Sequence, residues 1–167
     1  EGVVDVAALL ENQNQFLKSG RIVYSIKLYD ANNILIAVKE NSTFVNAGEK
    51  FLIFEPNVEA GNRVPKRVLL DIKEIFWESG KPSLLRVDTL QKSFSAANFS
   101  SRLEARLKNQ GTSSYRNIEV SALLISKDDK VLGVSKTILE RLSIGDELTA
   151  VFTWPQPISG VEKLEIF

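Results

Sequence analysis

The chain has 167 residues, of which 44% are hydrophobic and 25% are charged, so we expect a globular protein with one or two buried cores. Its 21 basic and 21 acidic residues give a formal net charge of zero, and without a basic excess we expect no nucleic-acid partner. It contains neither His nor Cys, which excludes Ser-His-Asp and Cys-His relays, the usual zinc and copper ligand sets, and disulfides.

The first half of the chain alternates apolar and polar residues, a period of two that is typical of strands with one buried face. Turns rich in Asn, Asp and Gly interrupt this pattern at residues 30–33 and 46–49. No stretch has the 3.6-residue apolar period of an amphipathic helix. We therefore predict strands over residues 4–10, 22–28, 50–54 and 69–72.

A short cluster of Gly, Pro and Ser at residues 79–83 interrupts the strand pattern, and we predict a linker there. The first domain then covers residues 1–78 and the second covers residues 84–167. The apolar stretch 84–94 is predicted to be the first strand of the second domain. The first domain has no counterpart of this strand, so we expect an upstream segment or a neighbouring molecule to complete it.

The second half of the chain repeats the first. Ala-Arg-Leu-Lys-Asn-Gln-Gly at residues 105–111 matches Ala-Leu-Leu-Glu-Asn-Gln-Asn at residues 8–14. An alternating run, a polar turn, a second apolar run and a Gly-acid pair follow each copy, which indicates two copies of one small domain. Further strands are predicted over residues 102–108, 117–126, 148–154 and 163–166. Short strands at this spacing predict an all-β protein made of antiparallel sandwiches.

Few acidic residues are candidates for chemistry. Asp30, Asp128 and Asp129 could offer oxygen ligands to calcium, but they lack the spacing of a calcium loop, and we predict plain hairpin tips. Glu49 and Asp146 occupy equivalent turns after Gly, which favours a structural role over a catalytic one. We therefore predict no catalytic residue, no metal site and no cofactor.

Four aromatic residues are the candidate contact sites. Phe76, Trp77 and Phe94 cluster around the predicted boundary, and Trp154 ends a strand before a proline. If they are packed, they fix the angle between domains; if they are exposed, they form a partner site or a sugar platform.

Residues 26–30, Ile-Lys-Leu-Tyr-Asp, resemble the FxLYD signature with Ile in the leading position. Residues 109–111, 115–120 and 142–146 are similar to the same domain in the second copy, although Leu-Ile-Ser at residues 124–126 replaces its Leu-Tyr-Asp core. The resemblance implies two consecutive immunoglobulin-like or fibronectin-III-like sandwiches, as in small membrane-anchored bacterial proteins. It also implies an extracytoplasmic, cell-surface location with a membrane anchor outside the given chain. The family offers no catalytic residues.

We therefore expect a non-enzymatic structural or binding module at a bacterial cell surface, presenting loops and strand edges to a protein partner. One alternative is a structural subunit that assembles by strand addition at the open edge of the first domain. Another is a carbohydrate-binding accessory module. No apolar run approaches the ~20 residues that a membrane-spanning helix needs, so we expect membrane contact only through an anchor outside these residues.

Overall fold

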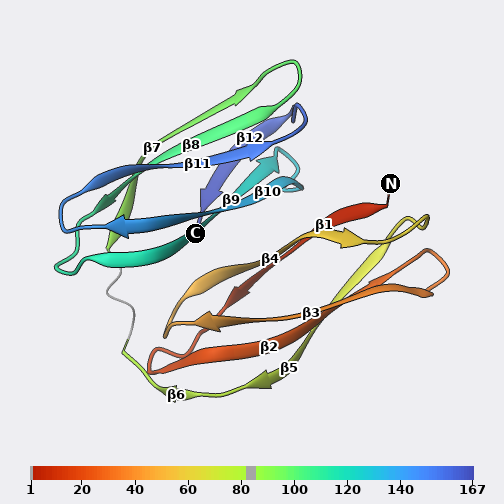
Figure 1. The fold of residues 1–167 in the computed structure, drawn as a ribbon, viewed down its shortest axis with the longest axis horizontal. Coiled ribbons are helices and arrows are strands. Elements are labelled where there is room, and N and C mark those ends of the chain that lie inside the picture. The colour runs from red at the N-terminus through yellow and green to blue at the C-terminus, as the bar shows by residue number, and fades with distance from the viewer. Residues whose placement is uncertain (1, 82–85) are drawn as a thin grey trace. The chain divides into compact units, whose positions relative to one another are not determined.

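The computed structural model describes residues 2–81 and 86–167, and the chain divides into two compact units, Glu1–Ser83 and Leu84–Phe167 (Figure 1). Every element of regular secondary structure in the described ranges is a β-strand, which confirms the all-β class. No helix that could span a membrane occurs in that part of the chain. Part of the predicted linker and the first residues of the predicted strand 84–94 lie outside the described residues.

The described residues of unit 1 form six strands in two antiparallel sheets. One sheet has the order β1-β4, and the other has the order β3-β2-β5, with β6 pairing to the beginning of β2. The strands are β1 (Val3–Glu11), β2 (Leu17–Tyr29), β3 (Leu35–Val45), β4 (Lys50–Glu59), β5 (Arg67–Ile75) and β6 (Glu78–Ser79).

Unit 2, over residues 86–167, also has six strands in two antiparallel sheets. The sheets have the orders β11-β8-β7 and β10-β9-β12. The strands are β7 (Val87–Ala96), β8 (Ser101–Asn109), β9 (Tyr115–Ser126), β10 (Val131–Leu142), β11 (Glu147–Trp154) and β12 (Val161–Ile166).

The two units share strand order, and the β1-β4 and β8-β11 pairs share their register from Val6 onward. Strands β1 to β5 of unit 1 pair with one another as β8 to β12 do in unit 2. Ala8 lies opposite Ile53 between β1 and β4, and the matching Ala105 lies opposite Ala150 between β8 and β11. The strands without a counterpart are β6 in unit 1 and β7 in unit 2.

In each unit, side chains from alternate strand positions on both sheets meet in one hydrophobic cluster. Fully burying such side chains contributes about 1.5–3 kcal/mol for each large aliphatic or aromatic residue. In unit 1 the buried members are Val6, Tyr24, Ile26, Leu28, Ile53 and Val58. In unit 2 they are Leu103, Ala105, Leu107, Val120, Ala122, Leu124, Ala150, Phe152, Trp154 and Ile158.

A buried asparagine, just beyond the end of β1 and at the end of β8, explains the asparagine of the repeated Asn-Gln pair. The Nδ2 of Asn12 donates to the carbonyl oxygens of Leu17 at 2.7 Å and Asn46 at 2.9 Å. Asn109 occupies the same place in unit 2 and donates to the carbonyl oxygen of Leu142 at 3.2 Å. Each asparagine thus satisfies loop carbonyls that would otherwise be buried without a partner.

Gly133 of β10 is required by the packing of Trp154. A Cβ at this glycine would lie 2.8 Å from Ile158 Cδ1 and 2.9 Å from Trp154 Nε1. The indole cannot retreat freely because its Nε1 donates to the carbonyl oxygen of Val134 at 3.0 Å.

We predict that Gly133→Ala lowers the free energy of unfolding by about 1–3 kcal/mol, because an added methyl overpacks this part of the core. Urea unfolding of the full chain, followed by tryptophan fluorescence, measures the change. Gly20→Ala is the control, since a Cβ there would make only an ordinary contact with Glu78, and it should change stability by less than about 0.5 kcal/mol. Equal stability of the two variants would contradict the packing described for Trp154.

Candidate functional site

The most distinctive feature of unit 1 is that β1 has one neighbouring strand where its counterpart has two. Within the described residues β1 pairs with β4 alone, whereas β8 lies between β11 and β7 (Figure 1). The backbone N–H and C=O groups on the other side of β1 therefore face no strand. We call this side the free edge of β1.

The core-facing residues of β1 are also less buried than those of β8. Ala105 and Leu107 of β8 are fully buried, but the matching Ala8 and Leu10 of β1 are only half-buried. In unit 2 the additional cover comes from β7, whose Val87 and Phe94 pack against the core cluster. No described strand of unit 1 lies in the place of β7.

The strand β5 is uncovered on the same flank. Val68 and Ile72 lie directly opposite the buried Leu28 and Tyr24, so their side chains point to the core side of the sheet. Even so, Val68 is 51% exposed and Ile72 is 39% exposed. Leu70 between them is half-buried and packs on the core cluster.

Unit 2 shows what covers this flank when a strand is present. There Lys92 Nζ of β7 donates to the carbonyl oxygen of Leu164 in β12 at 2.6 Å, so β7 lies beside β12. Leu164 and Ile166, on the core side of β12, are partly buried against the cluster. The free edge of β1 together with Val68, Leu70 and Ile72 is therefore the place of a missing strand, and we call it the open strip.

Strand β1 has little of the protection that exposed strand edges usually carry. Natural edge strands are commonly blocked by lysine, proline or bulges. The sequence of β1, Val-Val-Asp-Val-Ala-Ala-Leu-Leu-Glu, contains neither lysine nor proline, and its register shifts only between Val4 and Val6. The open strip is thus chemically suited to pair with another extended segment.

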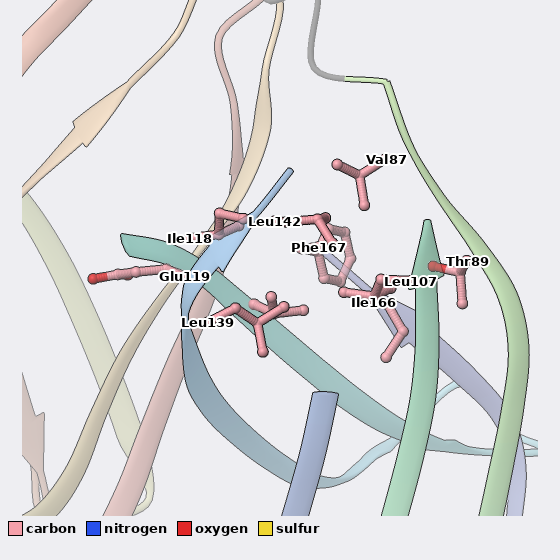
Figure 2. A pocket seen from close by; sticks show the side chains of 10 residues that line it. Val87, Thr89, Leu107, Ile118, Glu119, Leu139, Leu142, Ile166 and Phe167 are labelled. Atoms are coloured by element: carbon pink, nitrogen blue, oxygen red, sulfur yellow. The ribbon is translucent and has the colours of Figure 1, made fainter. Parts of the chain in front are cut away.

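An apolar cavity of about 100 Å³ lies between the sheets of unit 2 (Figure 2). Strand β7 contributes Val87 and Thr89 to its lining, and the end of the chain contributes Ile166 and Phe167. Figure 2 shows the Glu119 carboxyl pointing away from the side chains that gather around Phe167. The cavity is suited to apolar contact and offers no pair of groups for acid-base chemistry.

A buried carboxylate in unit 1 is a feature that our sequence analysis missed. Glu55 of β4 is buried, and its Oε1 accepts hydrogen bonds from the Tyr24 hydroxyl and, at 2.8 Å, from Asn41 Nδ2. It lies opposite Val6, where Phe152 lies opposite Leu103 in unit 2. The cluster links β2, β3 and β4, so we assign it a structural role. Its sequence signal was an acidic residue continuing the inward positions of β4.

The aromatic residues singled out in the sequence have different environments. Phe76 and Trp77 follow β5 in unit 1 and are 62% and 46% exposed. Phe94 packs on the core of unit 2, and Trp154 is buried within that core. Phe76 and Trp77 thus remain available for contact, whereas Trp154 serves the interior of its own unit.

The acidic turns serve the backbone. Asp30 Oδ1 accepts hydrogen bonds from the amides of Asn32 and Ile34, both at 2.9 Å, and its Oδ2 pairs with Arg63 at 2.8 Å. The amide of Ile34 is the main cause that lowers the pKa of the Asp30 carboxyl below its usual value, and Arg63 adds to this effect. Within residues 2–81 and 86–167 no group of three acidic residues could hold a metal ion.

The equivalent Gly-acid turns behave alike. Glu49 Oε2 accepts from the amide of Asn46 at 2.6 Å, and Asp146 Oδ2 accepts from the amide of Ser143 at 3.0 Å. Each carboxylate closes its own turn, while the preceding Gly48 or Gly145 has a positive φ that favours glycine. These carboxylates therefore have structural partners in both units.

No protein-family model matches this sequence, and a search of curated proteins finds no match.

We predict that Tyr24→Phe lowers the free energy of unfolding by about 1–3 kcal/mol, because the buried Glu55 carboxylate loses a hydrogen-bond donor. The double variant Tyr24→Phe/Glu55→Leu should recover part of this loss, since it removes the buried carboxylate, while the exposed Asn41 amide that also donates to Glu55 can turn to water. Denaturant unfolding of the full chain measures both. A loss below about 0.5 kcal/mol in the single variant would contradict the role of this cluster.

Proposed function

We propose that this chain is a non-enzymatic structural or binding module of two consecutive immunoglobulin-like or fibronectin-III-like β-sandwiches. Support comes from the two antiparallel sheets in each unit, whose side chains share one core, and from the strand order common to both units. The domain division at residues 79–83 belongs to this proposal, and the two compact units support it.

The module acts by accepting an extended segment of a partner along the open strip. The observation that carries this proposal is that β8 has a neighbour on both sides while β1 has a neighbour on one side among the described strands. Strand addition supplies affinity through backbone hydrogen bonds and specificity through alternate side chains. An incomplete sheet edge beside exposed core-facing residues offers both.

We place the module outside the cytoplasm, at a bacterial cell surface, with a membrane anchor outside these residues. This rests on the similarity of residues 26–30 to the FxLYD signature. Such a module needs no catalytic residue, cofactor or metal, and the hydrogen bonds that engage Asp30, Glu49, Glu55 and Asp146 within the fold support that view.

A second candidate function is carbohydrate binding, which the exposed Phe76 and Trp77 favour. Aromatic faces stack on sugars, so Trp77→Ala would abolish glycan binding if this surface carried the function. A glycan array with the full chain and this variant separates the two candidates.

Short peptides can be selected from a random library by their binding to the immobilised protein. We predict that the selected peptides bind at the open strip. Ile72→Lys should weaken the selected peptides at least about tenfold, because a lysine on this apolar flank blocks an incoming strand. Ile138→Lys is the control, since Ile138 is an exposed apolar strand residue in unit 2. Selected peptides that bind both variants equally, or that bind through unit 2, would contradict the proposed function.

A further inference from the structure

The open strip has a charge pattern that identifies what kind of strand fits it. This inference rests on the proposed function and deepens it by specifying the partner. The solvent-facing rows of β1 and β8 correspond from Val6 to Glu11, so both lie beside an incoming strand in the same way there. At Asp5 the register of β1 shifts, and Asp5 Oδ1 accepts a hydrogen bond from the amide of Asn57 in β4 at 3.0 Å.

In unit 2 the solvent-facing row of β8 is mainly basic, and β7 is suited to it. Lys108 lies opposite Asp88 of β7, and Arg102 lies opposite Ser95. The side chain of Lys108 also pairs with Glu147 of β11 at 3.1 Å.

In unit 1 the signs at both ends of this row are reversed. Glu11 stands where β8 has Lys108, and Asp5 stands where it has Arg102. Between them Ala7 and Leu9 replace charged residues, and Leu9 is exposed. Both acidic residues are at exposed positions.

A strand shaped like β7 would therefore meet like charge at Glu11, where its own Asp88 would lie. The same consideration opposes pairing of two β1 strands centred on Ala8, which would place Asp5 of one copy opposite Glu11 of the other. Opposed like charges destabilise cross-strand pairs, whereas opposite charges stabilise them. The row selects for basic residues at the two ends of the incoming strand.

The core-facing row sets a second requirement. In β7 the residues that enter the core are Val87, opposite Asn109, and Phe94, opposite Leu103. The corresponding residues of β1 are Asn12, just beyond its end, and Val6. An incoming strand should thus be apolar opposite Val6 and opposite Asn12, so that its side chains can pack on Val68, Leu70 and Ile72.

We propose that the open strip binds an extended segment of another polypeptide, antiparallel to β1, that is apolar on its core-facing side and carries Lys or Arg opposite Asp5 and Glu11. Charge complementarity with these two carboxylates distinguishes this partner from a second copy of the chain.

Two synthetic peptides test the proposal. One has the sequence of residues 86–97, and the other has the same sequence with D88K and S95K. The full chain should bind the basic peptide about tenfold more tightly, because two repulsive or neutral pairs become attractive. This preference should shrink as salt is raised. Adding V87D and F94D to the basic peptide should abolish binding.

Variants of the chain give the matched control. Glu11→Lys should remove or reverse the preference, whereas Glu140→Lys makes the same charge change at an exposed position of unit 2 and should leave it unchanged. Hydrogen exchange of the complex should show protection of residues 3–11.

The outcomes distinguish failure of the charge preference from failure of strand binding at β1. Equal binding of both peptides, with protection of β1, would overturn the charge rule and leave the proposed function standing. Absence of protection at β1 with every peptide would overturn both. Sedimentation that shows a dimer of the chain alone, lost in Ile72→Lys, would identify a second copy as the occupant and would also overturn the inference.

Discussion

Both units depend on the pairing of one strand with its neighbours. A strand inside a sheet satisfies its backbone groups on two sides, and β8 does so between β11 and β7. Strand β1 has the same register with β4 but no partner on its other side within the described residues. Unpaired backbone groups at a sheet edge readily accept another strand. Unit 1 can therefore accept a strand beside β1, whereas both sides of β8 in unit 2 are already paired.

The cores of the two units show how the same framework tolerates this difference. Asn12 and Asn109 each donate to two backbone carbonyls, so the ends of the repeat strands are fixed in both units. The interiors then diverge, since Glu55 with Tyr24 and Asn41 stands where unit 2 has Phe152. A hydrogen-bonded polar cluster joins three strands with fixed geometry. We infer that this cluster helps unit 1 to hold its shape while one flank is uncovered.

Much of the secondary structure could be predicted from the sequence, because a period of two records directly which side chains face the interior. Ile22, Tyr24, Ile26 and Leu28 were expected on one face of a strand, and all are buried. The lack of a counterpart for residues 84–94 also pointed to the first domain as the incomplete one. The FxLYD likeness and the location outside the cytoplasm stay predictions.

Other features could not be predicted, because they depend on neighbours that are distant in sequence. The depth of Trp154 depends on Gly133 leaving space for the indole, and the role of Glu55 depends on Tyr24 and Asn41 reaching it from two other strands. Val68 and Ile72 are exposed because no described strand covers them, which no local pattern records. The replacement of basic residues of β8 by the acidic Asp5 and Glu11 is apparent only when β1 is superposed on β8.

Hydrogen exchange of the uncomplexed full chain, resolved by residue with NMR, tests the central claim most directly. If β1 has a free edge, alternate amides of residues 5–11 should exchange on the order of 100-fold faster than the corresponding amides of residues 102–108, which are covered on both sides. Equal protection of the two strands would show that β1 has a second partner in solution and would contradict the account.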